Sequence, residues 1–239
     1  MLSDHTPPLC TNKTAVLHHL LEIVVIIEHI FIPEYALSIP VITQKQARLV
    51  QLAAQGLLNP PAQPATREDV LTAIRRMGLL QIDTIHVVAR SPYFVLFSRL
   101  GDYNARWLDE LLVDKALFEQ WSHAACFIPM EDFPLSRRLV LDEIRLSNFA
   151  DWGVKNLELI NQVLESVRLN GEMRSADFES KKESGGWWNW KNEKTALEYW
   201  LWKGELMVAR RDKFQRVYDL TERVLPNWND DHVPPLDDV

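Results

Sequence analysis

An amide and a carboxylate, Gln81 and Asp83, lie two positions apart in the largely apolar run 79–85. In an extended segment, residues two apart share a face, so an amide and a carboxylate would lie side by side with Leu80 and Ile82 buried behind them. A carboxylate in this position can activate a water or stabilise a developing cation, and the amide can hold that water. The spacing alone fits an exposed strand face equally well, so the pair indicates hydrolytic chemistry only when other features support it.

A second group of candidates is cationic and consists of Arg210, Arg211, Lys213 and Arg216. Polar and apolar residues alternate on both sides of 210–213, which predicts a β-hairpin with Arg210-Arg211-Asp212-Lys213 at its tip. Cations on such a hairpin can lie along a phosphate backbone and release counterions. The alternative is a solvated turn whose charge serves solubility.

His123 is a further candidate for acid–base chemistry, because an imidazole titrates near neutral pH. A histidine beside a tryptophan is more often a structural residue. The histidines of the chain lack the spacing of a metal site, and we expect neither a metal nor a cofactor. Cys10 and Cys126 are too few for a disulfide framework, and we read Cys126 as a buried apolar residue. A reducing intracellular setting is the default.

The surrounding sequence predicts a mainly α protein with small β-hairpins. Thr66-Arg67-Glu68-Asp69 resembles a capping box, which predicts a helix that ends at Gly78. Further helices are expected at 44–55, 103–120 (one or two), 131–150, 155–170 and 192–203, with a break at 127–129. Two helices followed by a basic hairpin form the order of a winged helix, and tryptophans at 187, 188, 190, 200 and 202 read mostly as core.

The formal charge of −7 for 239 residues argues at first against a nucleic-acid partner. The ends carry all of it, because residues 1–40 sum to −3 and residues 227–239 to −4, whereas 41–226 are neutral. The run 17–32 is apolar, but charged residues interrupt it, so we expect no membrane span. We expect 1–40 to be an appended segment; an incorrectly assigned translation start explains it equally well.

Several stretches resemble the winged-helix DNA glycosylases of the YcaQ/AlkZ kind, in the same order and from about Val41 to about Trp228. They are Leu80-Gln81-Ile82-Asp83-Thr84-Ile85, Ala89-Arg90-Ser91-Pro92-Tyr93, Leu96-Phe97-Ser98-Arg99-Leu100-Gly101, the stretch Trp121 to Pro129, Arg174-Ser175-Ala176-Asp177-Phe178, Gly186-Trp187-Trp188 and the stretch Phe214 to Leu220. The resemblance implies a monofunctional glycosylase that hydrolyses the N-glycosidic bond of N7-alkylated purines and unhooks guanine-N7 interstrand crosslinks in DNA repair.

The resemblance also implies roles for particular residues. Gln81 and Asp83 match the Gln-x-Asp form of the family's catalytic motif, and His123 would line the channel. The expected DNA contacts are Arg90, Ser91, Tyr93, Arg210, Arg211, Lys213 and Arg216. Ala124 replaces a glutamate that is usual in the family. The implied partner is double-stranded DNA with alkylated or crosslinked guanine, and we expect a cytoplasmic, nucleoid-associated monomer.

We therefore expect tandem winged-helix units. The predicted divisions are 1–40 (appended segment), 41–130 (first unit, with the catalytic motif), 131–164 (helical connector), 165–226 (second unit) and 227–239 (acidic tail and truncation point). The family continues well past the position of Val239, with a further winged helix and a β-barrel. A non-catalytic winged-helix DNA-binding protein, an inactive truncated remnant and an unstable product therefore stay open as alternatives.

Overall fold

The computed structural model describes residues 41–58, 63–83, 88–142, 150–178 and 192–236. The chain divides into two units, Met1–Gln44 and Lys45–Val239, and the helices and strands lie in the second apart from the first residue of α2. The appended segment predicted at 1–40 lies outside the described residues.

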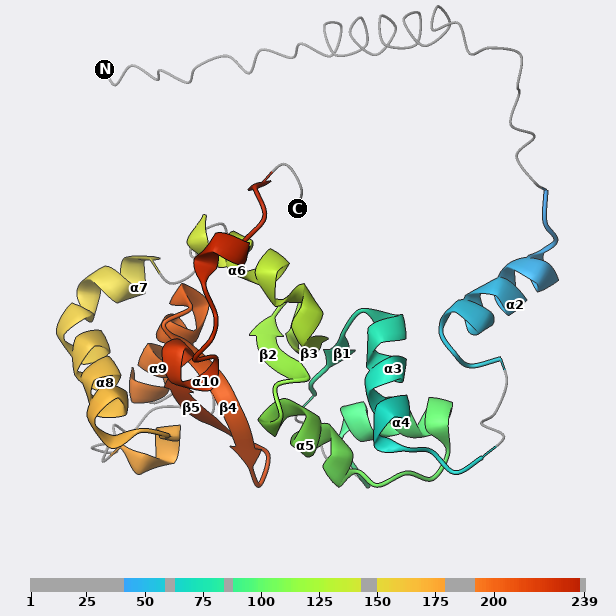
Figure 1. Cartoon of the computed structure of the whole chain (residues 1–239), viewed down its shortest axis with the longest axis horizontal. Coiled ribbons are helices and arrows are strands. Elements are labelled where there is room, and N and C mark those ends of the chain that lie inside the picture. The colour runs from blue at the N-terminus through green and yellow to red at the C-terminus, as the bar shows by residue number, and fades with distance from the viewer. Residues whose placement is uncertain (1–40, 59–62, 84–87, 143–149, 179–191, 237–239) are drawn as a thin grey trace, which may run out of the picture. The chain divides into compact units, whose positions relative to one another are not determined.

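The described part is mainly helical with two small antiparallel sheets, as predicted (Figure 1). The α-helices are α2 (Gln44–Ala54), α3 (Arg67–Met77), α4 (Ser91–Leu100), α5 (Arg106–Val113), α6 (Phe133–Leu141), α7 (Ala150–Lys155), α8 (Leu157–Asn170), α9 (Asn192–Lys203) and α10 (Thr221–Val224). The strands are β1 (Leu80–Gln81), β2 (Leu117–Trp121), β3 (Ala125–Pro129), β4 (Leu206–Asp212) and β5 (Gln215–Leu220), and short 3-10 turns follow at Met130–Asp132, Ser175–Asp177 and Asp230–His232.

The capping box predicted before α3 is confirmed. The Thr66 hydroxyl accepts the Asp69 backbone N–H at 3.3 Å, and the Asp69 carboxylate accepts the Thr66 N–H at 2.8 Å. These two bonds satisfy backbone donors that have no partner within the helix. Gly78 ends α3 with a φ of +79°. The chain changes direction at this residue and then enters β1 after Leu79.

The prediction for 103–129 is wrong in part. Helix α5 is present, but residues 117–121 form strand β2 instead of continuing a helix, and the expected break at 127–129 lies in strand β3. Lys115, with a φ of +60°, reverses the chain after α5. Short apolar runs fit a buried strand or a buried helix equally, and here pairing with the neighbouring strands decides.

The first sheet has the strand order β1-β3-β2, and the second is the hairpin β4–β5. Helices α3, α4 and α5 pack around the first sheet, whereas α8 and α9 pack on the hairpin (Figure 1). One core joins the two groups, since it contains residues of α3, β1 and α5 together with residues of α8, α9 and the hairpin. Helices α8 and α9 followed by a hairpin have the order of a winged helix, and the predicted boundaries at 41, 130, 164 and 226 stay predictions.

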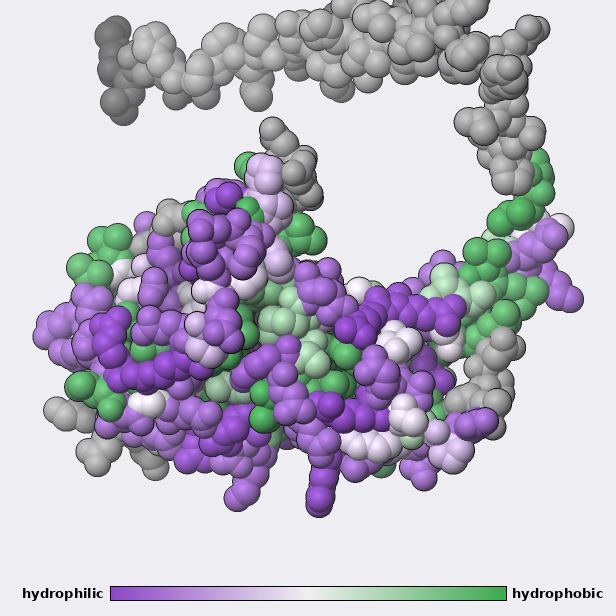
Figure 2. Space-filling model, viewed as in Figure 1, coloured by the Kyte–Doolittle hydropathy of each residue, from purple (hydrophilic) through white to green (hydrophobic). Residues whose placement is uncertain are grey.

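The end of the described chain packs on the body. Trp228 contacts Phe133 edge to face, with ring centroids 4.8 Å apart, and Arg137 donates two 2.9 Å hydrogen bonds to Asp230. One carboxylate of the predicted acidic tail, that of Asp230, is therefore paired with Arg137 of the body. At the other end, α2 has no buried residue, and Leu49 and Val50 are exposed. Figure 2 shows hydrophobic residues on the surface of this part of the chain.

Candidate active site

Strand β1 holds Gln81 at one edge of the first sheet, and Asp83 follows two residues later. Leu80 pairs with Phe127 and Gln81 with Cys126, and the Ile82 backbone N–H donates to a β3 carbonyl at 2.7 Å. This hydrogen bond extends the β1 conformation past Gln81. The backbone of the Gln-x-Asp motif is thus fixed by the sheet up to its middle residue.

The alternation expected for this segment is confirmed. The side chains of Leu80 and Ile82 are buried, with exposed fractions of 1% and 6%, whereas Gln81 is exposed and Asp83 is half-buried. The apolar residues of the motif therefore anchor it in the core. The amide and the carboxylate are left on the other face of the segment, where solvent or a substrate can reach them.

The structure brings His123 to Gln81. The turn between β2 and β3 carries His123, whose Nε2 lies 3.2 Å from the Gln81 Oε1. A carbonyl oxygen only accepts, so the imidazole N–H donates in this contact. With its oxygen occupied, the Gln81 amide has its N–H groups left to hold a water or a substrate atom.

Next to His123, the polar contacts of the turn are made by the backbone carbonyl of Ala124. Ala124 is half-buried, and its carbonyl accepts the Ser122 N–H at 2.8 Å and the Cys126 thiol at 3.4 Å. Burial raises the pKa of the Cys126 thiol. The structure therefore supports the reading of Cys126 as a buried apolar residue.

Residues Arg90, Ser91 and Tyr93 lie together where α4 begins, beside β1. Arg90 precedes the helix, and its carbonyl accepts the Tyr93 N–H at 3.1 Å. The Arg90 guanidinium lies over the ring of Phe214, 3.8 Å from the centroid. Burial and the charge of Asp109 raise the pKa of Tyr93. The predicted DNA contacts of these residues stay predictions.

The hairpin turn lies further along the chain than predicted. Lys213 and Phe214 form a two-residue loop with φ values of +47° and +69°, and Arg210 and Arg211 lie within strand β4. Positive φ at both residues is the conformation of the tight turn that matches strand twist. The turn was placed wrongly because neither residue is glycine or asparagine, which usually mark it.

Two of the four hairpin cations face inward, contrary to a placement along phosphate. Arg211 donates to both carboxylate oxygens of Glu119, at 2.8 and 2.7 Å, and Arg216 also bonds Glu119. The exposed fractions of the Arg211 and Arg216 side chains are 5% and 13%. Their charges neutralise a buried carboxylate in this conformation, so they are not available to phosphate.

The partners of these arginines, Glu119 and Glu198, were not among the residues predicted from the sequence. Burial alone would raise the pKa of the Glu119 carboxyl, but Arg216 and Arg211 outweigh it and hold the pKa below its usual value. Arg216 also bonds Glu198, which accepts the Tyr218 hydroxyl at 2.9 Å. The available signal was a glutamate following two apolar residues, Leu117 and Phe118, in a strand.

The other two cations are nearer to solvent. Arg210 is half-exposed and donates to Glu172 at 2.7 Å, and Lys213 is exposed on the turn. An ion pair between exposed groups is weak, so phosphate can compete for Arg210. These two residues are the hairpin cations whose position suits a DNA contact.

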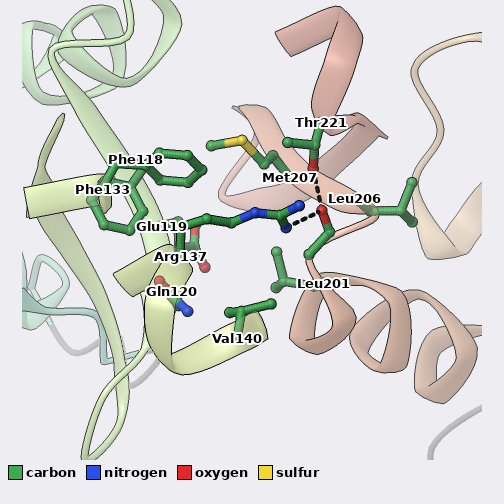
Figure 3. A pocket seen from close by; sticks show the side chains of 11 residues that line it. Phe118, Glu119, Gln120, Phe133, Arg137, Val140, Leu201, Leu206, Met207 and Thr221 are labelled. Atoms are coloured by element: carbon green, nitrogen blue, oxygen red, sulfur yellow. Dashed lines mark hydrogen bonds between the residues drawn. The ribbon is translucent and has the colours of Figure 1, made fainter. Parts of the chain in front are cut away.

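A small pocket lies beside the buried network. Its lining includes Glu119, Arg137 and Thr221, and both Arg137 and Thr221 donate to the Gly204 carbonyl, at 3.1 and 2.7 Å (Figure 3). Its volume of about 20 Å³ has room for one water. Neither Gln81 nor Asp83 lines it.

In the part of the chain that the structure describes, no group of three or more histidine, cysteine, aspartate or glutamate side chains is arranged to hold a metal ion. Within the same residues, no helix has the length and apolar character needed to cross a membrane.

Residues 74–238 match the family described as DNA glycosylase AlkZ-like. The class is therefore that of the DNA glycosylases, hydrolases that act on DNA in repair. Because the match covers more than half of the chain, the protein belongs to the AlkZ-like DNA glycosylase family. The match begins later than the resemblance at Val41 and includes most of the acidic tail. No solved structure matches the chain.

Proposed function

We propose that this protein hydrolyses the N-glycosidic bond of N7-alkylated purines and unhooks interstrand crosslinks joined through guanine N7. The observation that carries the proposal is the exposed Gln81 beside the half-buried Asp83, on a segment anchored by Leu80 and Ile82, in a member of a DNA glycosylase family. The proposal requires that a water and a nucleotide both reach this pair.

In the proposed reaction, Asp83 activates water and Gln81 positions it. The Gln81 N–H donates to the water oxygen, while His123 holds the amide oxygen. The water oxygen bonds to C1′ of the sugar and its proton passes to the Asp83 carboxylate. The C1′–N9 bond breaks, and its electron pair leaves with the base, so an abasic site remains. The carboxylate also stabilises the positive charge that develops on the sugar.

The chemistry of the lesion suits a site with so few groups. An N7-alkylated guanine is already cationic, so it becomes neutral as it leaves and needs no acid to protonate it. The exposure of Gln81 also supports a site on an open surface, because a base that is crosslinked to the other strand is too bulky for a tight flipping pocket. The proposed substrate is therefore duplex DNA with alkylated or crosslinked guanine.

The test is release of 7-methylguanine from methylated duplex DNA under single-turnover conditions. We expect Asp83→Asn to lower the rate at least a hundredfold, within the usual contribution of a general base, because the neutral amide neither takes the proton nor stabilises a cation. DNA binding, measured by fluorescence anisotropy, is expected to change less than threefold. Asp102→Asn, at an exposed carboxylate outside the motif, serves as the control.

Wild-type activity in Asp83→Asn would disprove this mechanism. Salt-dependent duplex binding by the wild-type chain without base release would instead identify a non-catalytic DNA-binding protein. We further propose that the protein acts as a monomer in the cytoplasm, in association with the nucleoid, where its DNA substrate would be. Sedimentation of the free protein and of its DNA complex tests the monomeric state.

A further inference from the structure

An aromatic ring at the tip of the hairpin lies against the segment that follows the Gln-x-Asp motif. The Phe214 ring has the Arg90 guanidinium 3.8 Å and the Arg211 guanidinium 4.5 Å from its centroid, and the Tyr93 ring 6.4 Å away. A guanidinium over an aromatic face is attracted by the ring quadrupole. We name Arg90, Arg211 and Phe214 the tip cluster.

The backbone conformation of Phe214 is an unfavourable one. Its φ of +69° is unfavourable for a residue with a side chain. The Phe214 carbonyl accepts a 2.6 Å hydrogen bond from the Arg211 Nη1. Arg211 therefore closes the turn from its own strand and keeps the ring directed toward Arg90.

The same arginine connects the hairpin to the first sheet. Arg211 bonds both oxygens of Glu119 on β2, and its guanidinium lies 5.7 Å from the ring centroid of Phe127 on β3. Leu80, Phe127 and Glu119 are aligned across the three strands, so their side chains share one face of the sheet. Gln81 lies on the opposite face.

The hairpin tip therefore contacts β2 and β3, which share a sheet with β1, and also Arg90, which precedes α4. Arg211 bonds Glu119 on β2 and lies near Phe127, the β3 residue that pairs with Leu80. After the motif, Phe214 packs against Arg90, which lies seven residues beyond Asp83. An element that contacts both the strand paired with β1 and the start of α4 limits the arrangements open to those two elements.

We propose that Phe214 and Arg211 are positioning residues for the glycosylase reaction. This proposal rests on the proposed function, in which Gln81 and Asp83 align water with the sugar. Small errors in such alignment lower a rate strongly, and a 1 Å displacement can cost about a hundredfold. Neither Phe214 nor Arg211 has to touch the substrate; both act through the placement of the motif.

The test variant is Phe214→Leu, which removes the ring but keeps an apolar side chain and leaves the Glu119–Arg211 pair intact. We expect the single-turnover rate of 7-methylguanine release at saturating DNA to fall about tenfold. The DNA concentration at half-saturation is expected to change less than twofold. Phe214→Tyr retains a ring and is expected to retain the wild-type rate.

A second measurement does not depend on base release. The Tyr93 amide, hydrogen-bonded to the Arg90 carbonyl, reports how firmly the segment after the motif is held. Its hydrogen exchange is expected to accelerate about tenfold in Phe214→Leu, while the amides of α8 keep their wild-type exchange. Phe97→Leu, at an exposed aromatic residue on α4, is the matched control and is expected to change neither readout.

The outcomes separate positioning from other roles. A wild-type rate in Phe214→Leu would overturn the proposal, and so would a loss that lies wholly in half-saturation or that Phe97→Leu reproduces. Faster exchange in α8 as well would show general destabilisation and would also overturn it. If the wild-type protein releases no base, the proposed function fails, and unchanged exchange at Tyr93 would separately overturn the positioning role.

Discussion

His123 Nε2 donates a hydrogen bond to the Gln81 Oε1 across 3.2 Å, from the turn between β2 and β3 to strand β1. This contact gives the Gln81 amide one orientation. Without it the amide would rotate freely, because Gln81 is exposed. The contact joins two residues that lie 42 positions apart in the sequence.

We expect His123→Ala to lower the rate of base release about tenfold, because the Gln81 amide loses its fixed orientation. His123→Gln can still donate an N–H and is expected to recover part of the loss. Ser122→Ala, in the same turn, is the control. Single-turnover release of 7-methylguanine measures all three, and equal rates in His123→Ala and the wild type would leave the histidine without a role in catalysis.

Glu119→Gln is expected to lower the free energy of unfolding at pH 7 by about 4 kcal/mol, because two buried guanidinium groups lose their carboxylate. The folded-state pKa of Glu119 is lowered, so its contribution is present above the unfolded value of 4.5 and is lost as the pH falls through the folded pKa. Urea unfolding at pH 7 and at pH 3 measures both proteins.

The difference in stability between wild type and Glu119→Gln should therefore shrink as the pH falls below about 4.5. Other carboxylates with lowered pKa values, such as Asp177 and Asp230, are present in both proteins and cancel in the comparison. A difference that stays the same at both pH values would mean that Glu119 is not charged in the folded protein.

Lys213→Gln is expected to weaken DNA binding and to reduce the slope of log K against log salt concentration by about 0.9, the value for one phosphate contact. Lys155→Gln, at an exposed residue of α7, is the comparison variant and is expected to keep the wild-type slope. Titrations of duplex DNA at several salt concentrations give the slopes. An unchanged slope for Lys213→Gln would remove the hairpin turn from the DNA interface.

Gly204→Ala is expected to lower the free energy of unfolding by about 3 kcal/mol. A Cβ there would overlap the Arg137 guanidinium and lie 2.8 Å from the Val140 Cγ1, and the φ of +72° adds backbone strain. Gly78→Ala has a similar φ of +79° but no atom within 4 Å of its Cβ, so it is expected to cost only about 1 kcal/mol. Equal losses in the two variants would refute the role of the clash.

The elements that could be predicted from the sequence are those determined by residues close together in the chain. The Thr66–Asp69 capping box, the helix 192–203 and the extended Gln-x-Asp segment are each determined by neighbours in the chain, and each was found. Strands β2 and β3 were missed because their pairing partners are distant, and a short apolar run does not show whether it will pair.

The contacts of the site were less predictable than its residues. Gln81 and His123 were both identified, but only the fold brings them within a hydrogen bond. The four hairpin cations were identified as one group. In the structure, two of them, Arg211 and Arg216, are buried because they bond Glu119, which lies 92 residues before Arg211. No spacing rule connects Glu119 to the hairpin, because the connection depends on how two sheets pack.

The pairing of Glu119 with the hairpin also has a consequence for folding during synthesis. A chain growing on the ribosome presents Glu119 long before the arginines at 211 and 216 are made. Until then the carboxylate has to stay hydrated, because burying it without a cation is unfavourable. Burial of Glu119 in the first sheet is therefore unfavourable while the nascent chain ends short of residue 211, the first of its two arginine partners.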